Sequence, residues 1–221
     1  MHIRATHSRP AASSLFSLRL LACVALCGLL AACGFRVKGP APLPFTTLYT
    51  NIAENSAFGA NIRRAIVANS PGTRWVAEPA DAEAKLIQIG NDQWLRELSI
   101  NAQGQVEEYE LNLQFIFQVT DARGRLVLPP TTLRATRELP YDPNAVQATQ
   151  GEIATIFRDM QQSMVDRVIR RLSSPDVQEA FANAASLPVE EAPVDTRPLP
   201  ANERPPVPQP MPRTGLGQGP F

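Results

Sequence analysis

The alternation of apolar and polar residues between positions 109 and 120 limits the possible folds more than any other feature of the sequence. Apolar residues occupy every second position, and the intervening residues are polar except Ile116. The apolar positions are Tyr109, Leu111, Leu113, Phe115, Phe117 and Val119, and the polar ones are Glu110, Asn112, Gln114, Gln118 and Thr120. A period of two is typical of a β-strand that buries one face and leaves the other in water. The sequence therefore predicts a long strand in a sheet with one open, polar face.

Three further segments predict strands of the same sheet. They are residues 46–50, residues 85–100 with a bend at 90–93, and residues 125–139. Residues 101–105 predict a hairpin turn, with Gly104 available for a positive φ. Pro129 and Pro130 indicate a kink or an edge position in the last strand, because proline cannot donate to a sheet ladder. Residues 73–76 are expected to be a short extended piece.

Two segments predict helices. The first begins at an N-cap, Asn55 or Ser56, and runs to about Ala68, and the second covers residues 145–172. Together with the strands they predict an α+β fold over residues 46–175. We expect a two-layer sandwich, with two helices packed on one face of a four-stranded, mostly antiparallel mixed sheet.

Residues 176–221 differ from the rest of the chain in composition. Eleven of the 21 prolines lie between Pro175 and Phe221, and few large apolar residues accompany them. Such a segment cannot bury enough surface to offset its chain entropy. We expect a proline-rich, mostly disordered tail with a short helical extension near residues 177–185. Two readings of the tail remain open, a partner-binding segment and a dispensable linker.

The first 32 residues are typical of an export signal of the lipoprotein type. Basic residues precede an apolar run at residues 20–30, which is too short to span a bilayer. The run ends in Leu30-Ala31-Ala32-Cys33, the pattern of a lipobox. We expect cleavage before Cys33, an N-acyl group and an S-diacylglycerol on that residue, and a tether over residues 33–45. Gly34 in place of an aspartate favours the outer membrane.

Loss of this leader removes most catalytic chemistry. Both histidines, His2 and His7, lie in the leader, as do Cys23 and Cys27. The mature chain would then contain no imidazole base, no free thiol and no His or Cys metal ligand. It would carry 18 basic and 21 acidic residues, which does not favour nucleic-acid binding. We expect a non-enzyme with no catalytic residue, no metal and no cofactor apart from its acyl groups.

Several segments, taken in order, resemble one known family. Residues 30–39 read Leu-Ala-Ala-Cys-Gly-Phe-Arg-Val-Lys-Gly, and the pair Glu108-Tyr109 follows a turn at Gly104-Gln105. The alternating strand comes next, and a Tyr141 segment then leads into a helix that ends in Arg170-Arg171-Leu172. Over residues 20–172 this order resembles the lipopolysaccharide-assembly lipoprotein family LptE, also called rare lipoprotein B.

The resemblance implies a function, a partner and a location. The family plugs the outer-membrane β-barrel protein LptD, assists its assembly and takes part in delivering lipopolysaccharide to the cell surface. The chain would be anchored through its lipid to the periplasmic side of a Gram-negative outer membrane. Some members are thought to bind lipopolysaccharide through basic residues near the strand tips, but the tip at 101–105 has none. The remaining candidates for pairing with lipid phosphates are Lys85, Arg96, Arg134 and Arg137.

Two other functional classes remain alternatives. The chain could be a generic periplasmic lipoprotein adaptor, such as a pilotin that escorts a secretin. It could also be a cell-wall hydrolase that uses carboxylates, since Glu107-Glu108 and Glu190-Glu191 are adjacent acidic pairs. The enzyme would need a cleft with two facing carboxylates.

Overall fold

A five-stranded mixed sheet forms one layer of the fold, with its strands in the order β2-β1-β3-β4-β5. The computed structural model describes residues 41–142, 144–189, 195–200 and 205–208, which belong to one unit that begins at Gly39. Its strands are β1 (Thr47–Thr50), β2 (Arg74–Trp75), β3 (Ala84–Ile100), β4 (Val106–Asp121) and β5 (Leu126–Pro140). β1 pairs in parallel with β2 and β3, whereas β4 is antiparallel to both β3 and β5. The predicted α+β class is confirmed.

The expected number of strands is corrected from four to five. Residues 74 and 75, expected only as an extended piece, form the edge strand β2. The Arg74 amide donates to the Thr46 carbonyl at 2.8 Å, and the Val76 amide donates to the Leu48 carbonyl at 3.1 Å. A strand of two residues is too short to show a period of two, so its pairing could not be read from the sequence.

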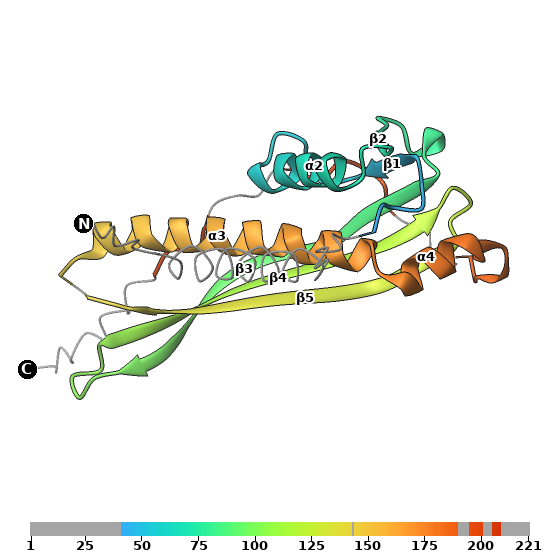
Figure 1. Cartoon of the computed structure of the whole chain (residues 1–221). Coiled ribbons are helices and arrows are strands. Elements are labelled where there is room, and N and C mark those ends of the chain that lie inside the picture. Colours follow the sequence, from blue (N-terminus) through green and yellow to red (C-terminus); the bar gives the residue numbers. More distant parts are fainter. Residues whose placement is uncertain (1–40, 143, 190–194, 201–204, 209–221) are drawn as a thin grey trace, which may run out of the picture. The chain divides into compact units, whose positions relative to one another are not determined.

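The two main helices lie on the same face of the sheet (Figure 1). They are α2 (Ala57–Asn69) and α3 (Val146–Leu172), and they contact each other as well as the strands. Ser56 caps α2 by accepting a hydrogen bond from the Gly59 amide at 2.9 Å. A side chain at position 59 would collide with the Ala53 carbonyl oxygen, which explains the glycine.

The apolar row of β4 forms the centre of the core beneath these helices. All six predicted apolar positions from Tyr109 to Val119 are buried, which confirms the alternation. Phe115 packs edge-to-face on Phe58 of α2 at 4.9 Å between ring centroids and stacks on Phe117. Burial of each large apolar side chain contributes about 1.5–3 kcal/mol, so this strand and its helix partners dominate the stability of the domain.

Two of the register shifts and one positive φ fall where the sequence predicts an irregularity. The register of β3 against β4 shifts between Gln88 and Gly90, at the start of the expected bend. A second shift between Phe117 and Val119 lies opposite Pro129 and Pro130 of β5, which is an edge strand. Gly104 has a φ of 77° in the β3–β4 turn, a conformation that other residues adopt with strain.

The second face of the sheet is open only over part of its length. Gln118 and Thr120, expected to face water, are buried. Tyr49 and Ile87 project to the same side, and with Ala82 they form a small apolar cluster there. This cluster covers the end of the sheet nearest β1. The open polar face is therefore limited on β4 to the residues that precede Gln118.

After α3 the chain forms further secondary structure before it enters the tail. Helix α4 (Pro175–Ala182) and the short 3-10 helix η2 (Ala184–Ser186) occupy the region where a helical extension was expected. The Leu126 amide of β5 donates to the Pro188 carbonyl at 3.1 Å, and Arg125 forms a β-bridge with Val189. The expected signal peptide, Cys33, most of the tether and the pair Glu190-Glu191 lie outside the described residues.

Candidate interaction surface

The open face of β3, β4 and β5 carries polar side chains from three adjacent strands. The register places Trp94 beside Asn112 and Arg96 beside Glu110, and it places Gln114 beside Arg134. This part of the face consists of Asp92, Trp94, Arg96, Glu110, Asn112, Gln114, Arg134, Thr136 and Glu138. Polar groups of both charges are therefore held in rows, with an aromatic ring among them.

Hydrogen bonds between strands fix most of these side chains. Arg96 donates to both carboxylate oxygens of Glu110, each at 2.9 Å. Asn112 donates to the same carboxylate at 2.9 Å and accepts from Thr136 at 3.3 Å. The hydrogen bonds from Arg96 and then Asn112 lower the pKa of Glu110 below its usual value, so this carboxyl remains ionised. The face is thus an ordered hydrogen-bonding surface, because its side chains hold one another in place.

The four predicted lipopolysaccharide-binding residues do not form a single cluster. Arg96 and Arg134 lie on the open face, where Arg96 is paired with Glu110 and Arg134 donates to Gln114 at 2.8 Å. Lys85 lies at the opposite end of β3 and donates to the Ala122 carbonyl at 3.2 Å. Its partner on β4 is ten positions from the partner of Arg96, or about 33 Å along a strand. Arg137 pairs with Leu111 and so belongs to the helix-covered side.

One margin of β3 is a feature that sequence reasoning missed. β1 pairs only with residues 84–86 of β3, and no other described strand lies on that side. The exposed apolar side chains of β3 are Ile89, Trp94, Leu98 and Ile100. Apolar residues in a long strand with an unpaired edge are a typical site for contact with another chain. The repeated apolar residues between positions 94 and 100 were a signal, but the absent neighbour strand was not visible in the sequence.

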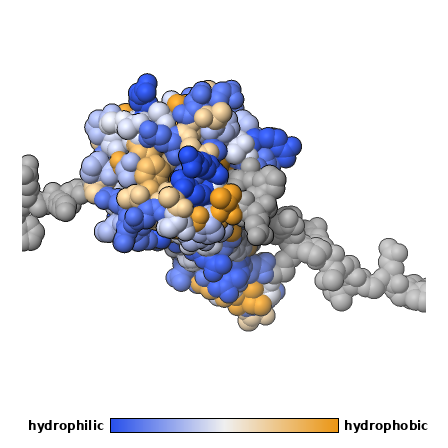
Figure 2. Space-filling model, turned by 90° about the vertical axis from the view of Figure 1, so that its right-hand side faces the viewer, coloured by the Kyte–Doolittle hydropathy of each residue, from blue (hydrophilic) through white to orange (hydrophobic). Residues whose placement is uncertain are grey.

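The end of the molecule near β1, β2 and α4 has a different surface. In Figure 2 its hydrophobic patches are small and are separated by hydrophilic surface.

The described residues contain no group of three or more His, Cys, Asp or Glu side chains placed to hold a metal. A cavity beside Trp75 has one carboxylate, Glu54, among its described lining residues, and a cavity beside Gln93 has none among its own. No helix within the described ranges has the length and hydropathy required to cross a bilayer.

Comparisons with known proteins define the class and then the family. The lipoprotein B of Nitrosomonas europaea, solved by NMR, is 25% identical with a TM-score of 0.54, covering 68% of this chain and 94% of its own. A rare lipoprotein B from Shewanella oneidensis is 21% identical with a TM-score of 0.47, covering 63% of this chain and 96% of its own. A minor lipoprotein from Acinetobacter baumannii is 21% identical with a TM-score of 0.49, covering 68% and 100%. The Nitrosomonas europaea structure, with its TM-score above 0.5, shows that this fold is found in a bacterial lipoprotein.

The family itself is shown by a model that describes it as "LptE: Lipopolysaccharide-assembly" and matches residues 45–172. This match covers more than half of the sequence and spans β1 to the end of α3. The chain belongs to the LptE family of lipopolysaccharide-assembly lipoproteins. Among curated proteins, no match to the chain was found.

Proposed function

We propose that this protein is an outer-membrane lipoprotein that plugs an LptD-type β-barrel, assists its assembly and takes part in lipopolysaccharide transport to the cell surface. The observation that carries the proposal is the ordered polar face of β3, β4 and β5 on a domain of the LptE family. The interior of a wide outer-membrane barrel is polar, and a narrow barrel is filled by its own side chains. A polar face with fixed donors and acceptors is suited to contact such a wall.

The same face offers one cation that is better suited to a lipid phosphate than the others. Arg134 contacts the neutral amide of Gln114, whereas the charge of Arg96 is balanced by Glu110. Guanidinium groups pair well with phosphate oxygens. We therefore place Arg134 first among the four candidates, with Arg96, Lys85 and Arg137 behind it.

The lipid anchor is the second part of the proposal. Acylation of Cys33 with an N-acyl and an S-diacylglycerol group would supply two or three chains, and more than one chain is needed for stable attachment. Mass spectrometry of the protein isolated from its own membrane tests this step. We expect a chain that begins at Cys33 and carries these groups, and an intact leader would contradict the proposal.

Depletion of the protein tests the function directly. We expect a loss of folded barrel protein in the outer membrane and a loss of lipopolysaccharide from the cell surface. In a separate experiment, purification of the acylated protein from undepleted cells should recover one large barrel protein. Normal amounts of folded barrel protein and of surface lipopolysaccharide after depletion would contradict the proposal. Recovery of a secretin in place of the barrel would also contradict it and would favour a pilotin.

A further inference from the structure

We propose that β1, β2 and α2 form a binding groove for an extended, proline-containing peptide, and that residues 195–200 of the same chain are its resident ligand. The proposal concerns a surface apart from the open sheet face. It depends on neither the barrel nor lipopolysaccharide.

The walls of the groove are aromatic and already fixed in place. Tyr49 and Trp75 line a cavity of about 420 Å³ together with Arg63 and Pro198. The Trp75 indole donates to the Arg63 carbonyl at 3.3 Å, and the Arg63 guanidinium lies 5.2 Å from the centre of the indole ring. Both terminal nitrogens of Arg63 also donate to the Ile52 carbonyl at 3.3 Å. Aromatic grooves of this kind are typical binding sites for proline-rich segments.

Hydrogen bonds hold the backbone of the tail segment to β1 and the residue after it. The Tyr49 hydroxyl donates to the Thr196 carbonyl, and the Asn51 side chain donates to the Asp195 carbonyl at 3.4 Å. In return, the Leu199 amide donates to the Asn51 carbonyl at 2.8 Å. Leu199 stands between two prolines, which have no amide hydrogen to give. Leu199 is therefore the one residue in the run 198–200 that can donate a backbone hydrogen bond.

The tail segment is also ordered by a contact of its own. Arg197 donates to Asp195 through its backbone amide and its side chain, at distances of 2.8–3.0 Å. These hydrogen bonds from Arg197 lower the pKa of Asp195 to about 2, so the pair stays charged at neutral pH. Together with Pro198 and Pro200, this local contact reduces the freedom that the segment loses on binding. Proline-rich segments lose little conformational entropy when they dock, because their backbone is already restricted.

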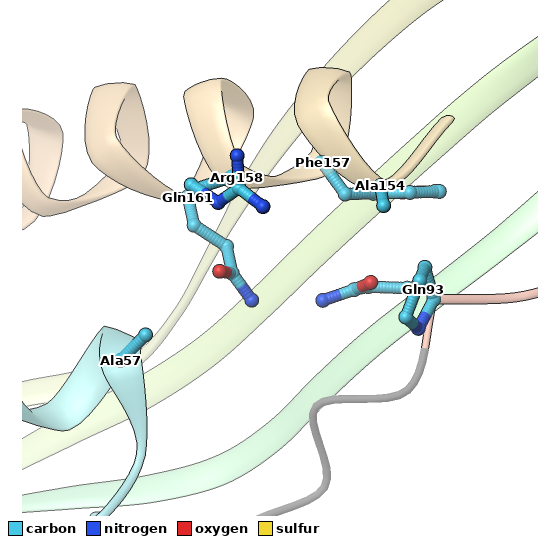
Figure 3. A pocket seen from close by; sticks show the side chains of 7 residues that line it. Ala57, Gln93, Ala154, Phe157, Arg158 and Gln161 are labelled. Atoms are coloured by element: carbon cyan, nitrogen blue, oxygen red, sulfur yellow. The ribbon is translucent and has the colours of Figure 1, made fainter. Parts of the chain in front are cut away.

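A second part of the tail meets the same domain at another cavity. Pro205 lines a cavity of about 190 Å³ between β3 and the two helices. There the side-chain amides of Gln93 and Gln161 point toward each other, beside Phe157 and Arg158 of α3 (Figure 3). Two contacts made by one chain strengthen each other, because the first raises the effective concentration for the second.

Tryptophan fluorescence tests the groove in the purified full chain. The chain has only two tryptophans, so Trp94→Phe leaves Trp75 as the single reporter in the groove. In this background, Leu199→Pro removes the backbone donor, whereas Leu199→Ala retains it. We expect the proline variant to lower the docking constant about fivefold, the usual effect of one lost hydrogen bond. Acrylamide should then quench Trp75 more strongly in the proline variant than in the alanine variant, and circular dichroism should show that both variants are folded.

Addition of a synthetic peptide of residues 195–208 to the Leu199→Pro chain tests the binding site itself. The natural peptide should shield Trp75 again in a saturable way, and the peptide with Leu199→Pro should not. Hydrogen exchange gives an independent readout, since Tyr49→Phe should speed exchange of the Leu199 amide and Tyr141→Phe should leave it unchanged. Equal quenching in both variants, or a Leu199 amide that exchanges at the rate of unfolded chain, would overturn the proposal.

Discussion

The side-chain amide of Asn51 exchanges two hydrogen bonds with the backbone of Gln88. The Gln88 amide donates to Asn51 Oδ1 at 2.8 Å, and Asn51 Nδ2 donates to the Gln88 carbonyl at 3.1 Å. The side chain thereby imitates one more residue of β1 and completes its ladder with β3 after residue 86. Asn51 is buried, so it satisfies two backbone groups that would otherwise lose their partners where the parallel pairing ends.

Replacement of Asn51 by alanine should therefore destabilise the domain. We expect a loss of about 1–3 kcal/mol in the free energy of unfolding, because two backbone groups of Gln88 lose their partners. Urea denaturation measures this change. Asn69→Ala is the matched control, since Asn69 is exposed and donates only to the Ala65 carbonyl of its own helix. Equal losses in the two variants would contradict the role given to Asn51.

Phe115 should be the most costly residue to truncate on β4. It is fully buried between the rings of Phe58 and Phe117, so Phe115→Ala should lower the free energy of unfolding by about 3–5 kcal/mol. Ile100→Ala on β3 is the control and should change it by less than about 0.5 kcal/mol, because that side chain is 59% exposed. Thermal or chemical denaturation of both variants gives the comparison.

Asp121 should make the stability of the β4–β5 turn depend on pH. Burial alone would raise the pKa of this carboxyl, but hydrogen bonds from Arg125 and from the Arg123 amide outweigh it, and the pKa is lowered. A lowered folded-state pKa contributes stability above the unfolded-state pKa of about 4, and this contribution is lost as the pH falls through the folded-state value.

Asp121→Asn should remove this contribution. At pH 7 we expect the variant to lose about 1–3 kcal/mol of unfolding free energy, because a charged acceptor becomes neutral. Below pH 3 the difference between the two proteins should shrink. Urea midpoints measured at both pH values test this, and a difference that is independent of pH would assign the effect to packing and not to charge.

Variants of the Arg96–Glu110 pair distinguish an effect on partner binding from an effect on the stability of the fold. Arg96→Glu should weaken recovery of the barrel protein several-fold while leaving the domain folded, because the open face then presents two acids side by side. Arg64→Glu is the control, as Arg64 is an exposed arginine of α2. The double variant Arg96→Glu with Glu110→Arg rebuilds the pair in reverse. If it restores recovery, the pair acts by ordering the face; if not, the partner contacts Arg96 itself.

The sequence predicted those parts of the fold that follow from periodicity. The alternation around Phe115, the bulge near Gly90 and the edge position of Pro129 each have a local cause, and the structure places all of them as expected. β2 and the Asn51–Gln88 contact were missed, because each depends on a neighbour distant in the sequence.

The candidate surface was predicted less completely than the fold. The polar row at Glu110 and Asn112 follows from the alternation, whereas the separation of Lys85 from Arg96 follows from strand length and register. Composition alone indicated disorder for the tail, but composition cannot reveal the Leu199 contact with Asn51. The predicted lipid site at Cys33 and the four lipopolysaccharide contacts stay predictions.

The edge of β3 beyond Gln88, along which no other described strand lies, has a consequence for how this chain can change over evolution. A new strand can join such a margin without any rearrangement of the interior, so protection from unwanted self-assembly falls to a few local features. The charges of Arg96 and Glu97 and the register shifts beside Gly90 and Ser99 are features of that kind. Mutations that erase them would leave folding intact and would instead reveal themselves as aggregates during overexpression.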